Sequence, residues 1–444
     1  MRIDQLHIKN FKKFSDQALD LHPQFTLLVG ENGSGKTTIL DALAVALGVW
    51  LLDVPDSDVK NSQRPIYTSE IRLEPIKEGD RTLFREAPAG VTVSAHGEIA
   101  EGEPISWTRE IPRGAQKVSN VGAKQARKVI ASLYDRSERQ EGVILPVVSY
   151  YGAGRSWLPH HERKKAPARA NAPARRWAAF YDCLNERIRL ADLNEWFKGE
   201  AIAAVNLGGR FRPGFEVVRQ AVMRCIPGAD SMWYDGDRSQ IVLSINGQAQ
   251  PFGNLSAGQR MMLALVADIA IKAVTQNNGL VPSDSNFATR DGPPPVLART
   301  TGVVLIDELD VHLHPRWQRR VATDLKTTFP NLQFVCTSHS PQIIGEVEPD
   351  EIRLLDEPNV GLHPAQSFGL DSNAVLEEIQ GADSQDIQIR ALIDAVEQAL
   401  DIADLPTARQ RLLELRERVH GPTPDTTRLE ATINNLEALA DAAD

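Results

Sequence analysis

The segment at residues 30–37 has the residue types and the spacing of a phosphate-binding loop. It reads GENGSGKT, which matches GxxxxGK[ST] between an apolar, strand-like run and a helical run. Its glycines let the backbone curl so that N–H groups and the N-terminus of the next helix face an anion. Lys36 can then reach the β- and γ-phosphates of a nucleotide, and the hydroxyl of Thr37 can bind Mg²⁺. The segment therefore predicts a nucleotide-binding site.

We expect most of this loop to contact the bound nucleotide. The expected contacts are Gly30, Asn32, Gly33, Ser34, Gly35, Lys36, Thr37 and Thr38. The alternative is a chance glycine turn that caps a helix. The full motif, placed between a buried strand and a helix, favours the phosphate-binding interpretation.

Two adjacent carboxylates far along the chain supply the chemistry that the loop lacks. Residues 303–308 read VVLIDE, an apolar strand that ends in Asp307 and Glu308. Asp307 can hold Mg²⁺ directly or through water, which completes a metal site with Thr37. Glu308 is the candidate general base that deprotonates an attacking water. A strand-terminal acidic turn is the alternative, and the phosphate-binding loop makes it less favoured.

Two further elements lie in order along the chain. Residues 255–260 read LSAGQR before a helical run, so Ser256 can cap a helix whose N-terminus faces an anion, and Gly258 permits close backbone approach. His339 follows the strand-like LQFVCTS, where an imidazole can touch the γ-phosphate and the attacking water. Taken alone, the first is a capped helix and the second a structural histidine. Their order after the phosphate-binding loop favours a role for both in the nucleotide-binding site.

Apolar strands that alternate with helices must position these residues. We expect buried strands at residues 24–29, 143–150, 302–306 and 332–338, and a helix at 36–47. This alternation predicts an α/β fold with a mostly parallel central sheet. Short alternating runs between Ile66 and Ile111 predict an antiparallel β subdomain.

The order of the motifs resembles the ABC-type ATPase heads of the SMC/RecF-like group. The resemblance implies an ABC-type P-loop NTPase that binds ATP and Mg²⁺, with Lys36, Glu308 and His339 as catalytic residues. It also implies that Ser256 and Gly258 serve the nucleotide of a partner. The working unit would then be a homodimer that sandwiches two ATP molecules head to tail, or a higher oligomer.

Longer strings are similar to a narrower bacterial AAA-family branch. They are VSYYGAGRSW at 148–157, LSAGQRMMLALVADIAIKA from 255 and LIDELDVHLHPRWQRRV from 305. That branch includes the ATPase subunit of Septu-type and retron-linked antiphage systems, whose members often act beside a separate HNH nuclease. The resemblance implies an ATPase that controls an effector protein in antiphage defence. One departure is the missing Q-loop glutamine, whose place residues 152–155 are expected to take.

Two other functions compete with this one. The first is a DNA-binding ATPase in DNA repair or chromosome maintenance, although the chain lacks sustained heptads for coiled-coil arms. The second is a nuclease within the same chain, although no convincing cluster of metal-binding acids follows His339.

His312 and His314 could form a metal site with Asp310. The alternative is a turn before a helix that begins at Pro315, and the sequence favours this turn.

The chain divides into four expected parts with unequal charge. They are an ATPase lobe at 1–150, a helical insertion with a basic loop at 151–239, a second ATPase lobe at 240–360 and an acidic helical tail at 361–444. Residues 371–444 hold 16 acidic and 6 basic residues, which accounts for the net charge of −10. Residues 155–176 hold seven basic residues against one acidic residue. Within them, residues 163–176 form either a nucleic-acid contact or a solvated loop. The acidic tail either docks a basic partner or maintains solubility.

Composition excludes several classes of protein. With 42% hydrophobic and 24% charged residues the chain is neither disordered nor fibrous. Its longest apolar run is too short to span a membrane, and no signal peptide is evident, so we expect a cytoplasmic protein without a membrane anchor. Cys183, Cys225 and Cys336 lack metal or disulfide spacing and are expected to be buried thiols.

Overall fold

The protein folds into two compact units, each with its own hydrophobic core. The computed structural model describes residues 1–60, 63–78, 81–87, 89–100, 102, 104–156, 176–283, 292–356 and 360–441. The first unit is Met1–Asp371 and the second is Ser372–Asp444. Much of the expected basic loop, residues 157–175, lies outside the described residues.

A five-stranded parallel sheet organises the first unit, in the order β14-β3-β13-β12-β8. Its strands are β3 (Phe25–Val29), β8 (Val147–Tyr151), β12 (Gly302–Ile306), β13 (Leu332–Thr337) and β14 (Ile352–Leu354). Almost every strand residue is buried, as continuous apolar strands in a covered parallel sheet should be. The expected α/β fold with a parallel central sheet is confirmed.

One strand begins later than the sequence suggests. The run from Val143 was expected to be extended to Tyr150, but β8 starts at Val147. Pro146 has no N–H to give to a ladder, and the N–H of Leu145 bonds to the side-chain Oδ1 of Asn277 at 2.8 Å instead. Strand pairing therefore starts just after the proline.

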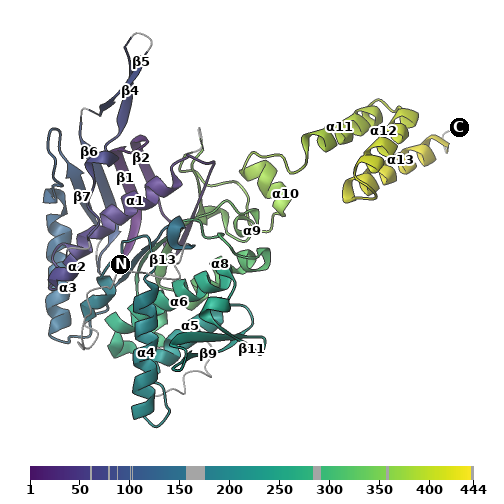
Figure 1. Ribbon diagram of the computed structural model, residues 1–444. Coiled ribbons are helices and arrows are strands. Elements are labelled where there is room, and N and C mark those ends of the chain that lie inside the picture. Colours follow the sequence, from purple (N-terminus) through teal and green to yellow (C-terminus); the bar gives the residue numbers. More distant parts are fainter. Residues whose placement is uncertain are drawn as a thin grey trace. The chain divides into compact units, whose positions relative to one another are not determined.

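Helix α1 (Lys36–Leu47) joins the parallel sheet to an antiparallel one. The antiparallel sheet has the order β2-β1-β6-β7, formed by β1 (Arg2–Phe11), β2 (Phe14–Asp20), β6 (Val91–Glu98) and β7 (Ile105–Ile111). The helix contacts strands of both sheets, and ten of its twelve residues are buried. A separate hairpin, β4 (Leu73–Glu78) with β5 (Arg81–Glu86), projects beyond this sheet (Figure 1). The expected antiparallel β subdomain is thus confirmed.

Helices and a small sheet complete the first unit. The remaining longer helices are α3 (Lys124–Glu138), α4 (Leu190–Asn206), α5 (Pro213–Cys225), α6 (Ala257–Gln276) and α8 (Pro315–Thr328). The short helices are α2 (Ser57–Lys60), α7 (Pro295–Arg299) and α9 (Pro341–Ile344). The small sheet has the order β11-β10-β9, from β9 (Ala229–Asp235), β10 (Gln240–Ile245) and β11 (Gln248–Pro251).

The insertion expected at residues 151–239 is helical only in part between Arg176 and Asn206. The segment starts with a single 3₁₀ turn at Arg176–Phe180, and α4 begins only at Leu190. Between them the backbone lies beside β8, because the N–H of Tyr150 bonds to the carbonyl of Cys183 and that of Gly152 to the carbonyl of Glu186. Pairing with the sheet edge overrides local helix propensity here.

The second unit is helical. Its longer helices are α11 (Ile387–Asp401), α12 (Leu405–Arg418) and α13 (Pro424–Asp441), preceded by α10 (Ser372–Ala374) and a π-helical turn at Val375–Ile379. The three longer helices enclose a small apolar core that includes Val396, Leu412 and Ile433.

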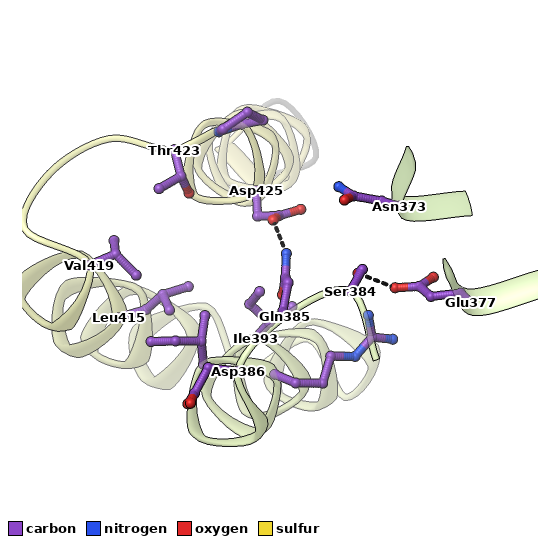
Figure 2. A pocket seen from close by; sticks show the side chains of 13 residues that line it. Asn373, Glu377, Ser384, Gln385, Asp386, Ile393, Leu415, Val419, Thr423 and Asp425 are labelled. Atoms are coloured by element: carbon purple, nitrogen blue, oxygen red, sulfur yellow. Dashed lines mark hydrogen bonds between the residues drawn. The ribbon is translucent and has the colours of Figure 1, made fainter. Parts of the chain in front are cut away.

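A cavity of about 560 Å³ opens in the second unit. Figure 2 shows Gln385 facing Asp425 and Ser384 facing Glu377 across it. The Gln385 amide donates to the carboxylate of Asp425 at 2.6 Å, and the Ser384 hydroxyl donates to Glu377. These polar groups therefore bond to one another.

Candidate nucleotide-binding site

The loop between β3 and α1 has the backbone conformation that its glycines predict. Gly33 and Gly35 have φ values of 83° and 105°, which L side chains rarely adopt. A Cβ atom on Gly35 would also lie 2.6 Å from the ring of Phe14. Helix α1 starts at Lys36 without a side-chain cap, so its first N–H groups remain available to an anion.

The ammonium group of Lys36 lies over the loop. Its Nζ donates to the carbonyl of Gly30 at 2.7 Å and to that of Glu31 at 2.8 Å. Burial lowers the pKa of Lys36, while the carboxylates of Asp356, Asp307 and Glu308 act in the opposite direction. A buried cation that donates to two backbone carbonyls is suited to an anionic ligand.

Asp307 connects the two halves of the expected metal site. The hydroxyl of Thr37 donates to its Oδ2 at 3.0 Å, and that of Thr337 donates to its Oδ1 at 2.6 Å. Asp307 follows β12 and Thr37 opens α1, so the carboxyl edge of the parallel sheet brings them together. The structure thus joins residues that the sequence separates widely.

Glu308 and His339 lie at the same edge. Glu308 has φ 50°, and its N–H donates to the hydroxyl of Thr337 at 2.7 Å, which holds the backbone in this turn. His339 follows β13, the strand next to β12. The side chains of Glu308 and His339 are both exposed. Asp310 lies close to this strand end, because Ser338 donates to its Oδ1 at 2.6 Å. An acid and an imidazole therefore flank the carboxyl end of these strands.

The LSAGQR segment forms a capped helix start, as its sequence predicts. The N–H of Gln259 donates to the hydroxyl of Ser256 at 3.2 Å, and the Gln259 side chain accepts from the N–H of Ser256 at 2.9 Å. Gly258 packs against its own chain, since a Cβ there would lie 2.4 Å from the carbonyl oxygen of His312. The helix start is thus fixed to the turn that follows Glu308.

Sequence reasoning missed two groups beside the loop. The carboxylate of Asp356 accepts the N–H of Glu31 at 2.9 Å, and the ammonium of Lys13 donates to the carbonyl of Gly33 at 2.8 Å. Asp356 comes just after β14, the edge strand beside β3, so its position after a buried strand could have indicated it. Both groups support the backbone that would surround phosphates.

The side chains present fit a magnesium-bound triphosphate. The hydroxyl of Ser34 is buried within the loop and has no hydrogen-bond partner, which a phosphate oxygen would supply. Thr37 and Asp307 offer the hard oxygen ligands that Mg²⁺ prefers. Asn32 is exposed on the loop, and Thr38 is half-buried in the first turn of α1.

The alternative metal site around His314 is not supported by the geometry. His314 caps α8 by accepting the N–H of Arg316 at 3.2 Å. Within the described residues, no group of three or more His, Cys, Asp or Glu side chains is arranged to hold a metal ion. The turn before Pro315 therefore leads into helix α8, as expected from the sequence.

Comparison with known proteins agrees with this geometry. A family model described as "AAA domain" matches residues 5–200, and one described as "AAA domain, putative AbiEii toxin, Type IV TA system" matches residues 242–345. Both stretches of the chain are therefore similar to AAA domains. The two matches carry the phosphate-binding loop and the VVLIDE strand, respectively.

The chain is also similar to curated proteins named for retron and Septu systems. It is 23% identical to the Retron Vc95 probable ATPase of Vibrio cholerae over 80% of this chain and 74% of the relative. It is 25% identical to the Septu protein PtuA of Bacillus mycoides over 80% of this chain, and it spans only 40% of that protein. The expected resemblance to this AAA branch is confirmed.

A solved structure in the comparison is an Smc head bound to the C-winged helix domain of ScpA. It has 15% sequence identity, covers 82% of this chain and 96% of its own, and has a TM-score of 0.46.

Among the described residues, no helix is long and apolar enough to cross a membrane.

Proposed function

We propose that this protein hydrolyses ATP to ADP and phosphate at the carboxyl edge of its parallel sheet. The hydrogen bond of 3.0 Å between Thr37 and Asp307 carries the proposal, because it joins the phosphate-binding loop to the acidic strand end. A bound Mg²⁺ would neutralise part of the negative charge of the triphosphate. Thr37 and Asp307 would hold the ion.

The other residues have separate roles in the proposed reaction. Lys36 leaves the loop carbonyls and binds the β- and γ-phosphates, whose negative charge favours its protonated form. Glu308 accepts a proton from the attacking water as the water oxygen bonds to the γ-phosphorus. His339 orients that water and the γ-phosphate. The bond to the leaving oxygen of ADP breaks as the new bond forms.

We propose a homodimer as the working unit, with the possibility of higher assembly left to experiment. Ser256 caps α6 and Gly258 lies in its first turn, and the positive end of that helix suits the γ-phosphate of ATP bound by a second copy. ATP would then bridge two heads, and hydrolysis would remove the bridge. Gly258 lies against the turn after Glu308, so the two motifs would respond together.

The proposed biological role is control of an effector protein in antiphage defence. The similarity to a retron ATPase and to PtuA supports this role. An HNH nuclease is the effector that we propose, with the nucleotide-dependent dimer as the element that restrains or releases it. A cytoplasmic location and contact with nucleic acid through residues 163–176 belong to this proposal.

Turnover and assembly of two variants test the proposal. Lys36→Ala should abolish ATP binding, because the charge that faces the phosphates is lost. Glu308→Gln should keep ATP binding while hydrolysis falls by about 10²–10⁴-fold. It should also accumulate as an ATP-bound dimer in size-exclusion chromatography with light scattering. Turnover that is unchanged in both variants would contradict the proposed function.

A further inference from the structure

The chain between the 3₁₀ turn at Arg176–Phe180 and α4 brings an additional acid to the proposed site. The N–H of Tyr150 donates to the carbonyl of Cys183 at 2.8 Å, and the N–H of Gly152 donates to the carbonyl of Glu186 at 2.9 Å. On the other side of β8, the N–H of Asp307 donates to the carbonyl of Tyr151 at 2.8 Å. Residues 183–186 therefore lie beside β8 and deliver Glu186 to the strand end that neighbours Asp307.

Contact with Gly152 fixes the side chain of Glu186 at this position. A Cβ atom on Gly152 would lie 2.6 Å from Cβ and 2.7 Å from Oε2 of Glu186. Only glycine leaves room for the carboxylate against the end of β8. The pKa of Glu186 is raised, first by partial burial and then by the nearby carboxylates of Asp41 and Asp307.

Tyr150 gives an independent indication that a polar ligand belongs here. Its side chain is 1% exposed, and its hydroxyl forms no hydrogen bond. Burial raises the pKa of Tyr150 most, and the charges of the Asp41, Asp307 and Glu186 carboxylates raise it further. A buried hydroxyl without a partner is costly and uncommon, so its presence beside these acids calls for a missing partner.

We propose that the hydroxyl of Tyr150 and the carboxylate of Glu186 together hold a water ligand of the magnesium ion bound by Thr37 and Asp307. The inference rests on the proposed function, because it concerns the metal of the same site. The phenol donates or accepts one hydrogen bond and the carboxylate accepts another, which fixes the water without direct contact with the metal. Both are positioning residues.

A water ligand would also explain why a tyrosine occupies this buried position, where its hydroxyl forms no hydrogen bond with the protein. A structural role alone would be served equally well by phenylalanine, which fills the same space without an unsatisfied hydroxyl. Stability and metal affinity should therefore respond to Tyr150→Phe in opposite directions. That opposition separates the proposal from simple packing.

The experiment compares variants of the full chain by two measurements. The first is the melting temperature without ligand. The second is the Mg²⁺ concentration that gives half of the maximal thermal shift at saturating ATP, with ATP and EDTA as the metal-free reference. Neither measurement requires turnover, so an effect on metal binding is seen apart from an effect on chemistry.

We expect Tyr150→Phe to melt at the same temperature as the wild type or higher. Both Tyr150→Phe and Glu186→Gln should need about tenfold more Mg²⁺ for the half-maximal shift, the size typical of a lost outer-shell partner. The shift by metal-free ATP should not change. These results together would support the shared water.

Two control variants define the background. Tyr134→Phe removes a buried hydroxyl that does have a partner, the carbonyl of Trp50, so it should melt lower with an unchanged Mg²⁺ requirement. Glu195→Gln removes an exposed acid from α4 and should alter neither measurement.

The outcomes distinguish this inference from the proposed function. A wild-type protein that shows no thermal shift with ATP and Mg²⁺ would overturn the proposed function and the inference with it. A wild-type shift with the same Mg²⁺ requirement in both variants would overturn the inference alone. A change in only one of the two variants would overturn the shared water.

Discussion

The hydroxyl of Thr37 lies 3.0 Å from Oδ2 of Asp307, although 270 positions separate the two residues. Thr37 belongs to the first turn of α1, and Asp307 follows β12, a buried strand between β13 and β8. The second carboxylate oxygen of Asp307 is held by Thr337 at 2.6 Å. This double support orients the carboxylate toward the phosphate-binding loop.

The first prediction concerns coupling between these two residues. Thr37→Val and Asp307→Asn should each weaken binding of ATP with Mg²⁺, and the double variant should lose less than the sum of the two. A coupling energy of about 0.5–3 kcal/mol is typical of groups that share one partner. Calorimetric titration of the four proteins measures it.

A matched pair provides the control for this cycle. Thr26 is a buried threonine of β3 whose hydroxyl accepts the N–H of His22 instead. Thr26→Val combined with Asp307→Asn should give additive effects on binding. Additivity in the Thr37 cycle as well would show that Thr37 and Asp307 do not share a ligand.

The second prediction compares two glycines of the loop. Gly33 and Gly35 both have positive φ, but a Cβ on Gly35 would meet the ring of Phe14, whereas one on Gly33 would meet nothing within 4 Å. Gly35→Ala should therefore lower the free energy of unfolding by about 1–3 kcal/mol more than Gly33→Ala. Urea denaturation measures both values, and equal losses would argue against the contact with Phe14.

The third prediction concerns the cysteine thiols and pH. Cys183, Cys225 and Cys336 are buried, and burial raises the pKa of Cys183 and of Cys225 to about 12. Because the thiolate is the reactive form, their alkylation should stay slow as the pH rises from 7 to 9. Alkylation of free cysteine, whose pKa is about 8.5, becomes much faster over that pH range.

Mass spectrometry after iodoacetamide treatment tests this expectation. The native protein should carry almost no label at pH 9, and the protein in urea should carry three. Rapid labelling of the native chain would show that one of the thiols is accessible.

The sequence predicted the helix and the strand that carry the expected motifs well, because their signals are local. The GENGSGKT segment includes its own glycines and the first residues of its helix, so α1 was expected at residues 36–47 and is observed there. The strand at residues 302–306 is likewise an uninterrupted apolar run that ends in acids. That both would meet at one sheet edge follows from parallel strand order.

The residues that sequence analysis missed depend on contacts between distant segments. Glu186 reaches the site because residues 183–186 pair with β8, and nothing in their own composition indicates such pairing. Tyr150 was identified only as part of a buried strand, since a missing hydrogen bond is visible only in three dimensions. Asp356 similarly requires knowledge that β14 lies beside β3.

The most direct test of the account is calorimetric titration of the protein with ATP, once with Mg²⁺ and once with EDTA. Lys36→Ala should abolish binding in both conditions, because its ammonium contacts the phosphates whether or not metal is present. Asp307→Asn should leave metal-free binding unchanged and remove the gain in affinity that Mg²⁺ gives the wild type. Equal binding of ATP with Mg²⁺ by all three proteins would contradict the claim that the loop and the acidic strand end share one nucleotide.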